Sequence, residues 1–284
     1  MPRSLFHRTA STARAVRAVV ARPPYVTPGH FYSPLTVEAD LVRALSWTEA
    51  PGVDLAEERQ LALAARLRPA LAERPPGPRY VADNRMYGAA DAAVYRAMLS
   101  YLRPAHVMEV GSGYSTAVAL DEADANPGLS GLEITCIEPF PERLLGIIKE
   151  SDRNRLAVLR QPVQDVDPAI YERLVPRDVL FVDSTHVVKA GSDVVWLFCH
   201  VLPSLAPGVV VHVHDVFWPF EYPAQWLRQR RDWTEAYLLH AFLAGNVSWE
   251  ILFFSSWFWR CQPELVPRAL ARAEPGSIWL RKVR

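Results

Sequence analysis

The segment 109–116, which reads Glu-Val-Gly-Ser-Gly-Tyr-Ser-Thr, limits the folds open to this chain more than any other feature. It joins an apolar run that starts at His106 to a helical pattern that starts at Tyr114, which is the order strand, turn, helix. Gly111 and Gly113 permit a tight turn and let a ligand approach the backbone where a Cβ atom would collide. This segment, which we call the glycine loop, therefore predicts a nucleotide-binding turn.

The glycine loop differs from a dinucleotide fingerprint at one position. A dinucleotide-binding loop has a third glycine where this chain has Thr116, because the pyrophosphate needs room at the helix N-terminus. A nicotinamide oxidoreductase is therefore disfavoured, although it stays open as a third interpretation.

Beyond the glycine loop, strand-like and helix-like runs alternate along the chain. This alternation is typical of a parallel sheet with helices on both faces. We predict strands at 106–110, 133–137, 156–159, 179–182, 208–214, 249–254 and 277–282. We predict helices at 114–124, 141–149, 167–174, 190–204, 223–244 and 264–272. Seven strands, the last two beyond a long helix, favour a doubly wound, mostly parallel α/β sheet over a six-stranded dinucleotide fold.

The first 83 residues differ in character from the rest. Residues 38–73 have leucines at helical spacing, and 73–79 form a linker by composition. The first 37 residues contain five arginines and no acidic side chain, which is typical of a transit peptide or, as we prefer, of a loosely ordered basic arm. We expect an N-terminal arm and helical extension at 1–83 and an α/β domain at 84–284.

Composition excludes several classes of protein. The chain has 31 basic and 31 acidic residues, so it lacks the basic excess that binds a nucleic-acid backbone. No apolar run reaches the roughly 18 residues of a membrane span. Cys136, Cys199 and Cys261 are scattered among apolar residues, which favours free thiols in a reducing compartment. We expect a cytoplasmic protein with no nucleic-acid partner and no membrane span.

The strand ends carry polar residues, and ligands of open parallel sheets bind beyond the carboxyl ends of the strands. Glu109 ends the first predicted strand. Glu138 follows the second, where it can accept hydrogen bonds from both ribose hydroxyls or complement the dipole of the next helix. Asp165 follows the third strand and is alternatively an N-cap for helix 167–174, a role also open to Asp167.

The fourth and fifth predicted strands end in two aspartates and two histidines: Asp183, His186, His214 and Asp215. These side chains should converge on one cleft. Unpaired burial of charge costs several kcal/mol, so four such groups at adjacent strand ends favour a functional site. A self-satisfied network of histidines and aspartates is the alternative. His212 alternates with valines deeper in the strand, which indicates a structural role.

From about residue 84 to the C-terminus, the chain resembles the class I S-adenosylmethionine-dependent methyltransferases, and within them the macrocin and rhamnosyl O-methyltransferases of bacterial natural-product pathways. The motifs are Glu-Val-Gly-Ser-Gly-Tyr-Ser at 109–115, Ile-Glu-Pro at 137–139, Val-Asp-Ser-Thr-His at 182–186 and His-Val-His-Asp-Val at 212–216. The resemblance implies a seven-stranded Rossmann-like methyltransferase domain at 84–284. It implies S-adenosylmethionine as cofactor, bound by Glu109, Gly111, Ser112, Gly113, Tyr114, Glu138, Asp165 and Asp183, with Asp165 at the adenine amine.

The resemblance also implies a metal site. In relatives such as catechol O-methyltransferase, acidic residues after the fourth and fifth strands hold magnesium, so Asp183 and Asp215 become metal ligands with His214 in the remaining position. Magnesium prefers oxygen ligands, whereas imidazole suits zinc, iron or manganese. A divalent metal is therefore a second candidate cofactor, with Mg, Mn, Fe and Zn all open.

These residues together predict methylation of a hydroxyl on a small molecule of natural-product or sugar type. The catalytic residues are His186, Asp183 and His214. His186, near the general-base position of the relatives, is the expected base because imidazole has a pKa of about 6.5. The alternatives are a cofactor-binding protein without catalysis and a metal-independent N-methyltransferase. The Asn/Asp-Pro-Pro-Tyr signature of adenine and glutamine N-methyltransferases is absent after the fourth strand. We expect a small-molecule acceptor as partner and consider a homodimer.

Two aromatic groups lie near the predicted site in sequence. Residues 218–222 are expected to form an apolar lid. Aromatic clusters more often build a core or a dimer face than line a pocket, and we expect this of Trp249, Trp257, Phe258 and Trp259.

Overall fold

The computed structural model describes residues 25–73 and 77–284. They fall into two compact units, a smaller one of residues up to 47 with 224–232 and a larger one of 48–223 with 233–284. The basic arm predicted at the N-terminus lies mostly outside the described residues. Among the described residues, none of the helices has both the length and the apolarity that a membrane crossing requires.

The smaller unit joins two segments that are distant in sequence. Helices α2 (Glu38–Ala44) and α9 (Ala224–Arg228) contact each other. The backbone N–H of Thr36 donates to Asp232 at 3.4 Å, which links the two segments.

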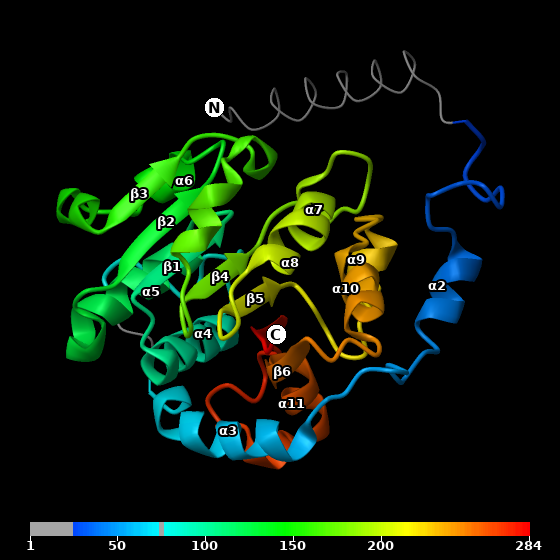
Figure 1. The fold of residues 1–284 in the computed structure, drawn as a ribbon. Helices are drawn as coiled ribbons and strands as arrows, with labels where there is room; N and C mark the ends of the chain where they lie inside the picture. Colours follow the sequence, from blue (N-terminus) through cyan, green and yellow to red (C-terminus); the bar gives the residue numbers. More distant parts are fainter. Residues whose placement is uncertain (1–24, 74–76) are drawn as a thin grey trace, which may run out of the picture. The chain divides into compact units, whose positions relative to one another are not determined.

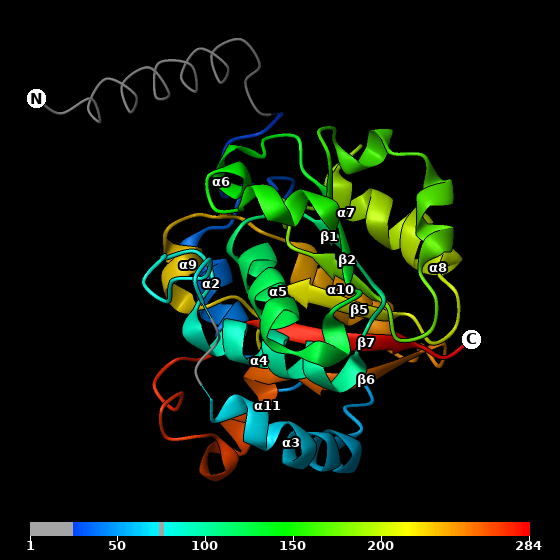
Figure 2. The same ribbon diagram turned by 90° about the vertical axis from the view of Figure 1, so that its left-hand side faces the viewer.

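The larger unit contains a seven-stranded sheet in the order β3-β2-β1-β4-β5-β7-β6. Strands β1 to β5 pair in parallel, whereas β7 runs antiparallel between β5 and β6 (Figure 2). The strands are β1 (His106–Val110), β2 (Glu133–Ile137), β3 (Leu156–Leu159), β4 (Val179–Val182), β5 (Val210–His214), β6 (Trp249–Phe254) and β7 (Ser277–Lys282). The predicted Rossmann-like methyltransferase sheet is confirmed, with β5 two residues shorter than expected.

Helices cover the sheet in layers. In Figure 1, α3, α4 and α5 lie below the sheet and α7 and α8 lie above it. The helices of the larger unit are α3 (Glu57–Leu71), α4 (Ala89–Leu102), α5 (Tyr114–Ala125), α6 (Glu142–Leu145), α7 (Asp193–Trp196), α8 (Leu202–Ser204), α10 (Glu235–Leu243) and α11 (Ser255–Cys261), with a π-helical segment at Leu197–Val201 between α7 and α8. Helix α4 is buried along nearly its whole length, which suits its run of alanine, valine and leucine.

Several predicted helices differ from the structure. The pattern at 223–244 gives two helices, α9 and α10, because Arg230 and Asp232 between them adopt left-handed backbone conformations that no α-helix contains. Residues 168–173 form a 3₁₀ helix that begins with Pro168, and only one turn of the predicted helix 141–149 forms. Helix 264–272 is replaced by a short 3₁₀ turn at Pro263–Leu265, whereas α11 lies in an aromatic run without a clear period.

Helix α3 belongs to the predicted N-terminal extension and lies against the sheet domain. Helix α3 packs on α4 and β6 within the larger unit, and its Leu63, Leu67 and Leu71 are buried. Gln60 is fully buried and accepts a hydrogen bond from the backbone of Phe254 at 2.7 Å. These contacts make the helical extension part of the same core as the sheet.

A buried ion network anchors the chain before α4. The guanidinium of Arg79 contacts Asp121 at 2.7 Å, Asp152 at 2.6 Å and Asp124 at 2.8 Å. Asp121 also accepts hydrogen bonds from the backbone of Arg79 and Tyr80. The network therefore fixes the start of the segment that leads to α4.

We predict that Arg79→Ala lowers the free energy of unfolding by about 3–5 kcal/mol, since it leaves buried carboxylates without their cation. Urea denaturation of the two proteins measures the difference. Arg153→Ala is the control, because Arg153 forms an exposed pair with Glu150 and such pairs contribute about 0–1 kcal/mol. Equal losses for the two variants would contradict the anchoring role.

Candidate functional site

The glycine loop lies against the end of β4. Gly111 has φ +86°, and a Cβ atom there would stand 1.9 Å from the carbonyl oxygen of Asp183. Gly113 has φ +156° and borders Arg143. Position 111 therefore requires glycine for two reasons. Its backbone is left-handed, and the loops that follow β1 and β4 approach each other closely there.

Glu109 lies beneath the glycine loop and is fully buried. Its carboxylate accepts hydrogen bonds from the hydroxyl of Thr116 and, at 3.5 Å, from the thiol of Cys136. Thr116 in turn accepts from the backbone of Gly113 at 3.1 Å. Burial raises the pKa of Glu109 to about 7, against the opposing effect of these hydrogen bonds. Thr116, which stands where a dinucleotide fingerprint has glycine, therefore links Glu109 to the backbone of the turn.

Glu138 lies at the rim of the same loop. It accepts hydrogen bonds from the backbone of Ser112 at 3.2 Å and of Phe140 at 2.8 Å, so it links the loops after β1 and β2. Asp165 is exposed. Asp167 takes the capping role that was open to both, since its side chain accepts from Ala169 at 3.0 Å.

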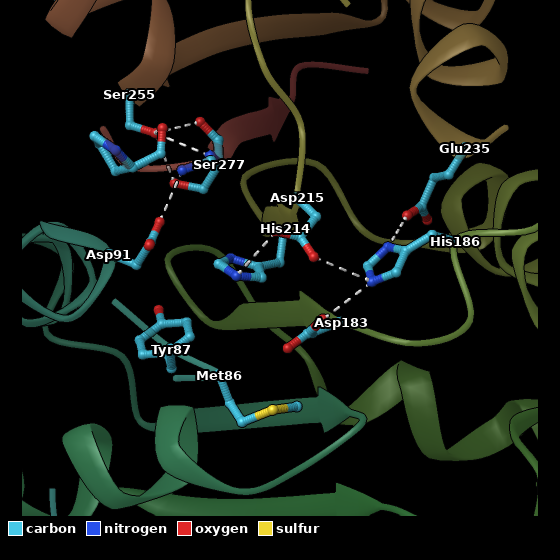
Figure 3. A network of polar contacts seen from close by, with 12 residues as sticks. Met86, Tyr87, Asp91, Asp183, His186, His214, Asp215, Glu235, Ser255 and Ser277 are labelled. Atoms are coloured by element: carbon cyan, nitrogen blue, oxygen red, sulfur yellow. Dashed lines mark hydrogen bonds and ion pairs between the residues drawn. The ribbon is translucent and has the colours of Figure 1, made fainter. Parts of the chain in front are cut away.

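His186 lies among three carboxylates (Figure 3). Its Nε2 is 3.4 Å from Asp183 and 3.6 Å from Asp215, while its Nδ1 is 2.9 Å from Glu235. Asp183 follows β4 and Asp215 follows β5, as predicted, but Glu235 comes from the start of α10. Neither composition nor spacing singled out Glu235.

Two of these residues have left-handed backbones. His186 has φ +59° and Asp215 has φ +56°, a conformation that costs a non-glycine residue about 1–3 kcal/mol and clusters at functional sites.

The loop after β4 is held by Asp193, which accepts hydrogen bonds from the backbone of Thr185 at 2.9 Å and from its hydroxyl at 2.6 Å.

The carboxylates change the protonation of His186. Burial alone would lower the pKa of this imidazole, but Asp183 and Glu235 outweigh burial and hold the pKa well above its ordinary value of 6.5. Burial opposes ionisation of Asp183 as well, yet the neighbouring histidines lower its pKa to about 2. His186 therefore stands as an imidazolium beside an ionised Asp183 at neutral pH, which differs from the nearly unperturbed imidazole expected from the sequence.

His214 lies on the other side of Asp215, 3.6 Å from its carboxylate. Its ring packs on Tyr87 with a centroid separation of 5.0 Å, and Asp91 lies nearby (Figure 3). Asp91 accepts a hydrogen bond from Gly276 at 2.9 Å, and burial raises its pKa to about 6. Tyr87 comes from the segment before α4 and Asp91 from the first turn of α4; neither was predicted as a site residue.

His212 has the structural role predicted for it. Its ring stacks on Phe181 at 4.0 Å between centroids, and Trp279 packs on it edge-on at 4.5 Å. Burial lowers its pKa well below 6.5, so it is a neutral member of the aromatic core.

One group of side chains has the spacing of a metal site. Donor atoms of Asp183, His186 and Asp215 lie within 4.8 Å of one another. Asp183 and Asp215 were both predicted as ligands, but His214, the third expected ligand, does not belong to this group, and His186 does. Two carboxylates and one imidazole suit manganese, iron or zinc better than magnesium.

The aromatic groups are mostly core. Trp257, Phe258 and Trp259 are buried in α11, and Trp249 is buried in β6. Within the expected lid at 218–222, Phe220 is also buried and its ring packs against Phe254 at 5.2 Å. This segment is thus packed against the protein rather than open to solvent.

Comparisons with known proteins found a family match and a sequence relative. The model of a methyltransferase domain family matches residues 108–216. An uncharacterised protein of Archaeoglobus fulgidus is 32% identical over 164 residues, which cover 52% of this chain and 72% of that protein.

Among solved structures, two O-methyltransferases match most of this chain at low identity. The O-methyltransferase TomG of Streptomyces achromogenes, involved in tomaymycin synthesis and solved with S-adenosylmethionine, is 16% identical, with 79% of this chain and 90% of TomG covered and a TM-score of 0.44. An O-methyltransferase of Bacillus cereus, solved with S-adenosylhomocysteine, is 16% identical, with 80% and 89% covered and a TM-score of 0.42.

The family match and the sheet order define the class of protein. Residues 108–216 form a methyltransferase domain, and the chain is a class I S-adenosylmethionine-dependent methyltransferase, as the strand-end motifs predicted.

We predict that the stabilising effect of His186 depends on pH. Because its pKa is raised in the folded protein, its contribution is complete below pH 6.5 and is lost as the pH rises through the raised value. Urea denaturation of the native protein and of His186→Gln between pH 6 and 10 measures this effect. The two stabilities should converge toward alkaline pH, and His200→Gln, at an exposed position outside the site, is the matched control. A gap that widens with pH would contradict the assignment.

Proposed function

We propose that this protein transfers the methyl group of S-adenosylmethionine to a hydroxyl of a small molecule, with His186 as the base. The observation that carries the proposal is the contact between Gly111 and Asp183. It brings the glycine loop to the residue that touches the His186 imidazole. A nucleoside bound along the loop would thus have its reactive end beside His186.

The residues of the loop fit the cofactor. Gly111 and Gly113 leave backbone surface without Cβ atoms, which a ligand needs for close approach. Glu138 holds its carboxylate at the loop through two backbone donors, the arrangement expected for binding ribose hydroxyls. We propose that these residues bind the cofactor together with Glu109, Ser112, Tyr114, Asp165 and Asp183. Bound there, S-adenosylmethionine supplies an electrophilic methyl group, whose bond to sulfur breaks as the new carbon–oxygen bond forms.

The chain must align the acceptor and remove its proton. Alignment of two reactants contributes several kcal/mol to such a displacement. The Nδ1 atom of His186 is occupied by Glu235, so Nε2 is the atom left to accept the hydroxyl proton. A base at this position contributes roughly 10² to 10⁴ in rate.

The imidazole must be neutral to act as a base, whereas the surrounding carboxylates favour its charged form. A divalent cation held by Asp183 and Asp215 would neutralise these carboxylates, lower the pKa of His186 and acidify the acceptor hydroxyl. The spacing of the two aspartate donors supports such a site, and in this proposal Nε2 of His186 is kept for the hydroxyl proton and does not bind the cation. We propose metal assistance for this reason, with His214 beside Asp215 as a further catalytic or ligand residue.

We also propose three finer points that rest on the sequence. They are an acceptor of natural-product or sugar type, a cytoplasmic location and a homodimer. The acceptor is the first of these to test, because it decides whether the polar group at the ends of β4 and β5 is catalytic.

We predict that the protein methylates at least one member of a panel of catechols, monophenols and sugars, with S-adenosylmethionine labelled in its methyl group and Mg²⁺ or Mn²⁺ present. Mass spectrometry of the product locates the new methyl group. His186→Ala should lower kcat by about 10²–10⁴, and the control His200→Ala should leave it unchanged. Cofactor affinity without turnover across the panel, or full activity of His186→Ala, would overturn the proposal.

A separate prediction concerns the cofactor alone. Glu138→Ala removes a charged hydrogen-bond acceptor, a loss of about 1.5–3 kcal/mol, so the affinity for S-adenosylhomocysteine should fall about tenfold to hundredfold in isothermal titration calorimetry. Glu142→Ala, at the exposed start of α6, is the matched control. Equal affinities of the two variants would show that Glu138 does not bind the ribose.

A further inference from the structure

The position of His186 depends on a side chain that the sequence motifs do not include. Glu235 lies 49 positions further along the chain, at the first residue of α10, and is 1% exposed. Its carboxylate contacts Nδ1 of His186 at 2.9 Å. A buried carboxylate on one ring nitrogen determines which way the other nitrogen points.

The residues before Glu235 hold the same loop through its backbone. The N–H groups of Thr234 and Glu235 both donate to the carbonyl oxygen of His186, at 2.9 and 3.1 Å. The hydroxyl of Thr234 accepts from the backbone of Val188 at 2.7 Å. The ring of Trp233 packs on the imidazole with a centroid separation of 4.4 Å. Three consecutive residues, 233–235, thus contact the ring, the carbonyl and the following turn.

These contacts offset the strain of the loop. His186 has a left-handed backbone, which persists only where the surroundings determine it. Two backbone hydrogen bonds and one charged side-chain contact from residues 233–235 hold His186 in this conformation. With Nδ1 engaged, Nε2 is directed toward Asp183 and Asp215 (Figure 3).

We propose that Glu235 is a positioning residue that orients His186 so that Nε2 faces the acceptor hydroxyl. The inference rests on the proposed function, in which Nε2 accepts the proton. Glu235 itself does not reach the acceptor through this contact, because the imidazole lies between it and the aspartates. Removal of Glu235 would leave Nδ1 without its buried partner and the ring free to turn.

The test uses two variants of the full chain and two measurements. Glu235→Gln keeps an oxygen that accepts from Nδ1, whereas Glu235→Ala removes it. In proton–nitrogen spectra of protein labelled at histidine, the Nδ1–H signal of His186, assigned by its loss in His186→Gln, should shift slightly in Glu235→Gln. It should broaden or disappear in Glu235→Ala. This measurement needs no cofactor, metal or acceptor.

With S-adenosylmethionine and the panel acceptors as substrates, Glu235→Ala should lower kcat about 10- to 100-fold, the effect typical of a partner that orients a functional imidazole. KM should change less than about threefold, and Glu235→Gln should keep most of kcat. Glu133→Ala is the control, because Glu133 contacts Nε2 of His106 at 3.4 Å at the opposite end of β1 and β2. It should change neither measurement.

Two results would overturn the role of Glu235. One is an unchanged His186 signal in Glu235→Ala. The other is a folded Glu235→Ala with the native kcat while His186→Ala is inactive, which would leave the proposed function intact. If His186→Ala is as active as the native protein, the proposed function itself fails, and the two failures are thereby distinguished. Should Glu235→Ala not fold, the spectrum of Glu235→Gln decides the matter: a shifted Nδ1–H signal of His186 supports the contact, and an unchanged signal overturns it.

Discussion

The site depends on the close approach of two backbone turns, those that follow β1 and β4. Parallel pairing of these strands brings their carboxyl ends together, and a side chain at position 111 would occupy the place of the Asp183 carbonyl oxygen. Only glycine meets both the spatial limit and the left-handed backbone. This contact joins the glycine loop, with Glu109 and Glu138, to the part of the site that contains His186.

The part of the site around His186 contains buried charged groups that stabilise one another. Burying an imidazolium or a carboxylate alone is costly, and a charge is tolerated in the interior when it is paired and hydrogen-bonded. His186 has such partners on both ring nitrogens. The same pairing opposes its use as a base, because each carboxylate stabilises the charged ring. A cation on the two aspartates would resolve this conflict, and for that reason we propose that metal and base act in one mechanism.

The sequence predicted the sheet well because short apolar runs between turn residues are local signals. All seven strands and the polar residues at their ends follow from such runs. Glu235, Tyr87 and Asp91 could not be found in this way, since each reaches the site from a helix or the segment before one, through tertiary packing alone. The prediction of one helix over 223–244 also placed Glu235 in the middle of a helix. In the structure the helix is broken before Glu235, and backbone N–H groups at the start of α10 donate to the carbonyl oxygen of His186.

A crystal structure of the protein with S-adenosylhomocysteine and Mn²⁺ tests the central claim most directly. We expect the ribose hydroxyls on Glu138, the sulfur on the Asp183 side of the glycine loop, and manganese anomalous scattering at Asp183 and Asp215, with Nε2 of His186 toward the acceptor space. A nucleoside bound away from the glycine loop, or a sulfur atom directed away from His186, would contradict it.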